Sequence, residues 1–160
     1  MFPVPTAQTL RGMTNTTTTT TTDVLQERIR EARALHAAGQ AGDFEAVLAA
    51  YDPHVVWTND AAAGPWAGRV EGIDAVAEMF AGFLTFFEGT FNQELLDVCA
   101  SSERTVTLLR ELGVKDGHQF DNRAVWVHRY AGDCIVEVTT LDIDRDAVVR
   151  FWEAVGPAGR

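Results

Sequence analysis

Residues 119–144 read QFDNRAVWVHRYAGDCIVEVTTLDID, and their pattern predicts two β-strands joined by a turn. The segments Gln119–Tyr130 and Cys134–Asp144 are rich in β-branched and aromatic residues, which favour strands. The connection Ala131-Gly-Asp is typical of a short hairpin turn. We therefore expect an antiparallel hairpin in this part of the chain.

The segments before this hairpin predict two further strands and, earlier still, mostly helices. The strands are expected at Thr90–Ser101 and Arg104–Val114, and Asp116-Gly117 predicts a turn after the second. The other expected elements are a helix from Asp23 with Gln26 as its capping box, ending at Gly39 and Gly42; a short helix capped by Asp43 and stopped by Pro53; a strand at His54–Asn59; a loop at Ala61–Glu71; a helix at Ile73–Glu88; and a final helix at Asp146–Val155. Helices followed by antiparallel strands predict an α+β domain with helices on one face of a curved sheet.

The charge balance narrows the possible partners. The 160 residues carry a net charge of −10, and Lys115 is the only lysine. Nucleic acids and anionic membrane surfaces both require clustered basic residues, which this chain lacks. The expected partners are therefore hydrophobic or neutral small molecules, or another protein subunit.

Residues 1–22 differ in composition from the rest. They are rich in threonine and contain Pro3, Pro5 and one charge, Arg11. We expect a disordered tail at 1–22, followed by one domain at 23–157. A secretory signal has basic residues followed by an apolar stretch, and this segment does not show that pattern. We therefore expect a cytoplasmic location.

Several common reaction types lack their motifs in this sequence. No glycine-rich phosphate-binding loop and no serine nucleophile elbow is found. The four histidines have no metal-ligand spacing, and Cys99 and Cys134 form no zinc motif. The chemistry expected is therefore independent of cofactors and metals.

The period of two along the last strands identifies candidate pocket residues. Asn122, Trp126 and His128 share one face of their strand. A three-residue turn would pair Tyr130 with Cys134 and bring Asp142 opposite Asn122, on the same face as His128. A two-residue turn at Gly132-Asp133 would put His128 and Asp142 on opposite faces. We favour the first register, because three-residue turns with glycine in the left-handed position are common.

Aromatic residues could line the same pocket. Trp57 and Asn59 lie on one face of the strand at His54–Asn59. Trp66 lies in a loop with glycine and proline. A large aromatic ring in such a loop usually packs over another group, so Trp66 is a candidate for the pocket. The other aromatic candidates are Phe80, Phe83, Phe87 and Trp126. For the phenylalanines, simple packing in the core is the alternative.

The order and spacing of four segments resemble a known family. These are Ala41-Gly-Asp-Phe, Tyr51-Asp-Pro-His-Val-Val-Trp, the thirteen residues from Gly68 to Phe80, and Tyr130-Ala-Gly-Asp-Cys-Ile-Val-Glu. Over roughly residues 24–155, the chain resembles the NTF2-like superfamily and its SnoaL-like, polyketide-cyclase-like group. The resemblance implies a cone-shaped fold, in which a curved antiparallel or mixed sheet and three helices on its concave face enclose a pocket.

The resemblance also implies roles for individual residues. SnoaL-like cyclases use an aspartate on the last strand as general acid/base, near a histidine on the preceding strand; Asp142 and His128 match these positions. The related epoxide hydrolases carry an aromatic residue and an asparagine at the positions that match Trp57 and Asn59. They also need Arg-x-Asp on a middle strand, whereas this chain has Arg110-Glu111, whose side chains should point to opposite faces. Epoxide hydrolysis is therefore doubtful.

Two classes of function follow. The first is a cofactor-independent cyclase or isomerase acting on an aromatic polyketide-like or other fused-ring molecule, with an epoxide hydrolase-like or dehydratase activity as a further alternative. The second is a non-catalytic module for ligand binding or assembly. In either case we expect a homodimer through the outer face of the sheet. That face should carry Arg123, Val125, Val127 and Arg129 beside Ile135, Glu137, Thr139 and Leu141.

Overall fold

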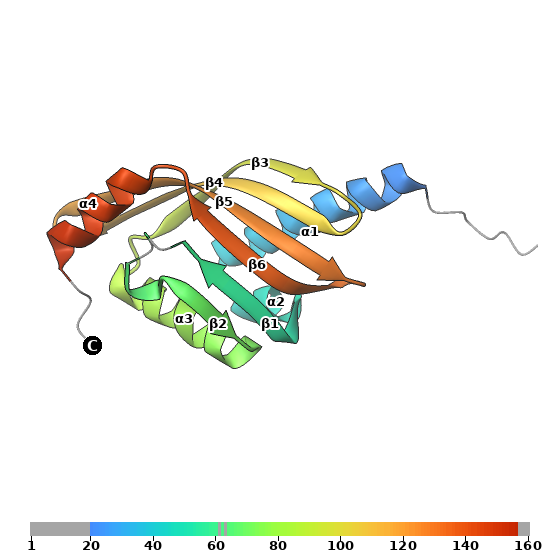
Figure 1. Ribbon diagram of the computed structural model, residues 1–160, viewed down its shortest axis with the longest axis horizontal. Coiled ribbons are helices and arrows are strands. Elements are labelled where there is room, and N and C mark those ends of the chain that lie inside the picture. The colour runs from blue at the N-terminus through green and yellow to red at the C-terminus, as the bar shows by residue number, and fades with distance from the viewer. Residues whose placement is uncertain (1–19, 61, 63, 157–160) are drawn as a thin grey trace, which may run out of the picture.

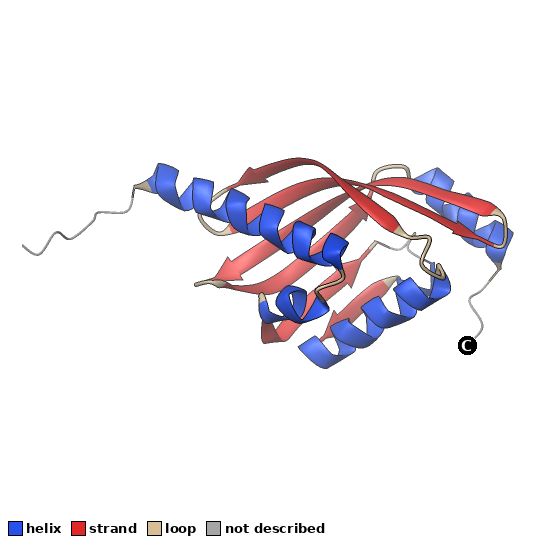
Figure 2. Ribbon diagram, turned by 180° about the vertical axis from the view of Figure 1, so that it is seen from behind, coloured by secondary structure: helices blue, strands red, loops and turns tan. Residues whose placement is uncertain are grey.

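Six strands form one curved, open sheet, with three helices across its inner face and a fourth at one end (Figures 1 and 2). The structure is a computed structural model and describes residues 20–60, 62 and 64–156. In chain order the elements are α1 (Thr21–Ala41), α2 (Phe44–Ala49), β1 (Tyr51–Asn59), the 3-10 turn η1 (Gly64–Trp66), β2 (Gly68–Glu71), α3 (Ile73–Phe86), β3 (Asn92–Ala100), β4 (Arg104–Lys115), β5 (His118–Ala131), β6 (Cys134–Asp142) and α4 (Arg145–Val155). The expected α+β class is confirmed.

The sheet has the strand order β2-β1-β6-β5-β4-β3. Strands β1 and β6 are parallel, and every other neighbouring pair is antiparallel. Figure 2 shows α1, α2 and α3 in front of the sheet, while α4 lies near the turn between β4 and β5 and contacts β5. Within the described ranges, no helix combines the length and the apolar character needed to cross a membrane.

Two clusters form the core between the helices and the sheet. In the first, Val55 and Trp57 of β1 and Val138 of β6 are almost fully buried, and Val76 of α3 packs against them. In the second, Phe87, Phe120 and Phe151 join the end of α3, the start of β5 and α4. The space between these clusters holds the cavity described below.

Some element boundaries differ from the sequence prediction. Helix α1 begins before Asp23, because Thr20 is the N-cap: its hydroxyl accepts a bond from the Asp23 N–H, and the Asp23 carboxylate accepts one from the Thr20 N–H. Residues 20–22 therefore belong to the domain, and the rest of the expected tail lies outside the described residues. Strand β1 includes Pro53, because the pairing of β1 with β6 is irregular between Tyr51 and Val56, so a missing N–H is tolerated there.

The β5–β6 hairpin follows neither expected register along its full length. Gly132-Asp133 forms a two-residue turn between Ala131 and Cys134, and a bulge at Val136 then shifts the pairing by one residue. Beyond the bulge His128 lies opposite Val138, and Asp142 lies opposite Ala124 rather than Asn122. The favoured register is therefore wrong, yet His128 and Asp142 do share the inner face. The bulge also turns Ile135 inward, so this residue does not belong to the outer face as expected.

The outer face of the sheet has no helix packed on it in the described part of the chain (Figure 1). Leu141 is 47% exposed there. Arg129 donates to Glu137 of its own chain at 2.8 Å, and Arg123 donates to Asp144 at 2.9 Å. This face thus combines uncovered apolar side chains with charges that are already paired.

Candidate functional site

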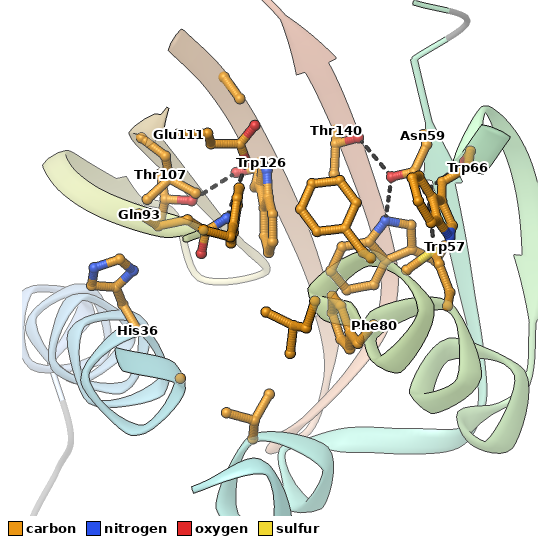
Figure 3. A pocket seen from close by; sticks show the side chains of 18 of the residues that line it. His36, Trp57, Asn59, Trp66, Phe80, Gln93, Thr107, Glu111, Trp126 and Thr140 are labelled. Atoms are coloured by element: carbon orange, nitrogen blue, oxygen red, sulfur yellow. Dashed lines mark hydrogen bonds between the residues drawn. The ribbon is translucent and has the colours of Figure 1, made fainter. Parts of the chain in front are cut away.

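A cavity of about 260 Å³ lies between the inner face of the sheet and the helices (Figure 3). Five of the aromatic residues expected to bind a ligand line it: Trp57, Trp66, Phe80, Phe83 and Trp126. Phe80 and Trp126 each meet Trp57 edge to face, with ring centroids 5.0 and 5.1 Å from that of Trp57. Phe87, also expected there, is fully buried in the second core cluster and lies outside the lining.

Glu111 is the most deeply buried carboxyl in this wall, with 7% of its surface exposed. Strand β4 points Thr107, Leu109 and Glu111 inward by its period of two, and the pairing places Glu111 between Gln93 of β3 and Asn122 of β5. Gln93 donates to Glu111 Oε1 at 3.0 Å, and Asn122 donates to Oε2 at 3.2 Å. Burial raises the pKa of Glu111 to about 7, although these two donors oppose the rise.

Asp142 lies on the other side of the same amide. The Asn122 side-chain nitrogen donates to Asp142 Oδ1 at 2.7 Å, so one buried amide bridges two carboxyl groups. Burial raises the pKa of Asp142 as well, and the neighbouring charge of Asp60 adds to this rise, against the Asn122 bond and Arg145. Asn122 itself has no exposed surface and does not line the cavity, so its role is to position the two carboxyls. The sequence prediction that Asn122 contacts a ligand is therefore wrong.

His128 lines the same cavity but is not beside Asp142. Asp142 lies opposite Ala124, four residues from His128 along β5, which is about 13 Å. No hydrogen bond joins His128 and Asp142 in the described structure; His128 Nδ1 instead lies 3.4 Å from the Thr105 hydroxyl. Burial lowers the pKa of His128 to about 4, so its imidazole is neutral at pH 7.

Asn59 links the aromatic residues of the cavity to the sheet. Its side-chain oxygen accepts from Trp57 Nε1 at 2.8 Å and from the Thr140 hydroxyl at 2.9 Å (Figure 3). Its nitrogen donates to the backbone oxygen of Trp66 at 2.8 Å and contacts Met79 Sδ at 3.1 Å. These contacts occupy both the oxygen and the nitrogen of the Asn59 amide. Asn59 therefore shapes the cavity wall.

The residue that the sequence prediction missed is Glu111. It was considered only with Arg110 as part of an epoxide-hydrolase pattern. The structure confirms that the two side chains point to opposite faces, because Arg110 makes two bonds to Asp121 on the outside, at 2.9 and 2.8 Å. The period of two through Thr107 and Leu109 was the signal that could have placed Glu111 in the cavity.

Comparison with known proteins agrees with this architecture. Residues 32–138 match the SnoaL-like domain family, and the chain belongs to this family. Its fold is NTF2-like, as expected. A search of curated proteins finds none that matches.

Solved structures with the same fold come from several sources. Bal32a, from a soil-derived mobile gene cassette, is 22% identical with a TM-score of 0.75, over 81% of this chain and 98% of Bal32a. An NTF2-like protein from Burkholderia pseudomallei K96243 is 23% identical with a TM-score of 0.68, over 76% and 94% of the two chains. A protein from Jannaschia sp. CCS1, described as a SnoaL-like polyketide cyclase, is 14% identical with a TM-score of 0.67, over 80% and 93%.

Proposed function

We propose that this protein is a cofactor-independent acid/base enzyme, a cyclase or isomerase, acting on an aromatic polyketide-like or other fused-ring ketone. The observation that carries the proposal is the pair of carboxyls, buried Glu111 and half-buried Asp142, joined by the amide of Asn122 at the wall of an aromatic cavity. Perturbed carboxyls that converge on an apolar pocket are typical of acid/base sites. The similar protein from Jannaschia is described as a SnoaL-like polyketide cyclase, which supports assignment of this chain to the same class of enzyme.

The two carboxyls differ in a way that suits a division of roles. Glu111 is the more deeply buried and carries a pKa of about 7, so a large fraction of the protein still holds this proton near pH 7. Asp142 is only half-buried, and its Oδ2 has no hydrogen-bond partner. With Glu111 protonated, only one negative charge occupies the wall, which allows Asp142 to act as the base.

The reaction follows from these roles. Asp142 removes a proton from the carbon next to a ligand carbonyl, and the electron pair of that C–H bond moves towards the carbonyl oxygen. Protonated Glu111 supplies a hydrogen bond where negative charge develops. In an isomerase Asp142 returns the proton to a different carbon. In a cyclase the enolate carbon forms a bond to a second carbonyl carbon, the π electrons of that carbonyl move to its oxygen, and the resulting alkoxide takes the proton from Asp142. The pair is Asp142 with Glu111 rather than with His128, because His128 lies about 13 Å along the strand from Asp142.

Deuterium exchange tests this proposal directly. 2-Tetralone, a fused-ring ketone with acidic α-protons, is incubated with the protein in D₂O, and loss of the α-proton signals is followed by NMR. Quenching of tryptophan fluorescence measures binding of the same probe. We expect the wild type to accelerate exchange and Asp142→Asn to abolish the acceleration, with binding changed less than threefold.

The matched control is Asp121→Asn, the same substitution at an exposed carboxylate on the outer face, which should exchange like the wild type. Binding of 2-tetralone without accelerated exchange would refute catalysis and establish a ligand-binding module. Failure of 2-tetralone to bind would refute the assignment of the cavity to fused-ring ketones.

A further inference from the structure

The cavity has a second polar position that the acid/base pair does not use. His128 is 3% exposed and lines the cavity, and its Nε2 atom is buried without a hydrogen-bond partner. Buried polar atoms are nearly always paired in native proteins, because an unpaired one loses its bonds to water and gains nothing. No described protein group pairs with this nitrogen, so a ligand that reaches it would gain a hydrogen bond.

The groups around His128 leave this nitrogen free. Thr105 of β4 faces Nδ1 at 3.4 Å and also lies 3.4 Å from the Tyr130 hydroxyl, two residues along β5. Arg28 of α1 stacks on the Tyr130 ring at 4.1 Å and bonds to Glu31 and to the backbone oxygen of Gly132. Val138, opposite on β6, is apolar. No described group forms a hydrogen bond to Nε2.

The chemistry of the missing partner follows from the state of the ring. A neutral imidazole has one donor nitrogen and one acceptor nitrogen, and either tautomer can form the contact with Thr105. A ligand hydroxyl can pair with Nε2 in both tautomers, since it both donates and accepts. An anionic group is disfavoured, because no lysine or arginine is found among the described residues that line this cavity, whereas two carboxyls are.

We propose that His128 is a positioning residue that bonds a phenol-type hydroxyl on the ligand, at the end remote from the reacting carbon. This rests on the proposed function, because Asp142 and Glu111 define the reacting end. The inner residue between the two ends on β5 is Trp126, whose ring also lines the cavity. The substrate class is then a flat fused-ring ketone that lies along β5, with its carbonyl end at Glu111 and Asp142 and a hydroxyl on the far ring at His128.

The test compares two probes that differ by one hydroxyl, 2-tetralone and 6-hydroxy-2-tetralone. Dissociation constants are measured by tryptophan fluorescence at pH 7, without any need for turnover. We expect the wild type to bind the hydroxylated probe about tenfold more tightly, which is the value of one well-made buried hydrogen bond. In His128→Phe this ratio should fall to about one, while His128→Gln, which keeps a polar group there, should retain part of it.

His36→Phe is the matched control, since His36 is the other histidine that lines the cavity; it should preserve the tenfold ratio. If His128→Phe fails to fold, the ¹⁵N shift of the His128 Nε2 atom in the wild type decides: it should move with 6-hydroxy-2-tetralone and not with 2-tetralone. Equal affinity of the wild type for the two probes, a ratio preserved in His128→Phe, or an unmoved Nε2 signal would overturn the proposal. Lack of deuterium exchange together with a preserved hydroxyl preference would refute the acid/base function alone.

Discussion

Replacing Glu111 by glutamine should change how the stability of the protein depends on pH. Burial raises the pKa of this carboxyl from 4.5 to about 7 in the folded state. Below pH 4.5 the group is protonated in both states and has no effect. As the pH rises from 4.5 to 7 the unfolded chain ionises while the folded protein keeps its proton, so the free energy of unfolding falls; above pH 7 the loss is complete.

The size of the effect follows from the same values. A tenfold difference in proton affinity is worth about 1.4 kcal/mol, so the full loss is about 3 kcal/mol. Most of it, about 2–3 kcal/mol, falls between pH 5 and pH 8. Glu111→Gln carries no titrating proton at this position and should escape the loss. Its altered bonds to Gln93 and Asn122 add an offset that does not vary with pH.

Urea unfolding followed by tryptophan fluorescence at pH 5, 6, 7 and 8 measures this difference. Relative to the wild type, Glu111→Gln should become more stable by about 2–3 kcal/mol over the series. Glu94→Gln, the same change at an exposed glutamate of β3, should run parallel to the wild type. If the curve of Glu111→Gln is also parallel, the carboxyl is not held protonated by burial, and its assignment as the acid fails with it.

Three further predictions concern packing and assembly. Gly113→Ala should lose about 1–3 kcal/mol in thermal unfolding, because its Cβ would lie 2.6 Å from Cδ1 of the buried Phe87. At Gly82 of α3 the atom nearest to a Cβ would be Trp66 Nε1 at 3.4 Å, so Gly82→Ala should be tolerated, with a gain of up to about 1 kcal/mol; equal effects would refute the packing argument. Asn59→Ala should cost about 2–4 kcal/mol in urea unfolding, since it leaves Trp57 Nε1 and the Thr140 hydroxyl without an acceptor, and a cost near zero would show that water replaces it. Light scattering should give twice the 17.5 kDa of one chain, because apolar side chains on the outer face are uncovered, and Val127→Glu should halve that mass; a single-chain mass for the wild type would rule out the dimer.

The sequence predicted best those elements whose patterns are long and local. Helix α3 repeats Val76, Phe80 and Phe83 at helical spacing over about two turns, and its predicted start at Ile73 is correct. Strand β2 was missed because its four residues include Gly68 and have no strand pattern of their own; pairing with β1 makes it a strand. Local residue preferences cannot predict a strand that forms only because it pairs with a neighbouring strand.

The candidate site shows the same limit at the level of side chains. The period of two correctly put Trp126 and His128 on one face, whereas Asp142 shares that face because of the bulge and not through the favoured register. The period also says nothing about separation along the strands. Glu111 acquires its environment from three segments far apart in sequence, since Gln93 and Asn122 reach it across two different strand pairs. Only the combined registers of β3, β4 and β5 bring these groups together.

One residue, Val136, determines whether the site exists at all. The two-residue turn pairs Ala131 with Cys134, and this register continued without a break would place Asp142 opposite Arg123. Arg123 points to the outer face, where it bonds Asp144, so Asp142 would point outward as well. The bulge at Val136 adds one residue to β6 and moves Asp142 opposite Ala124, within 2.7 Å of the Asn122 amide. A bulge is a local irregularity in hydrogen bonding, but every side chain beyond it changes face. The bulge at Val136 therefore sets the direction of Asp142, six residues further along β6.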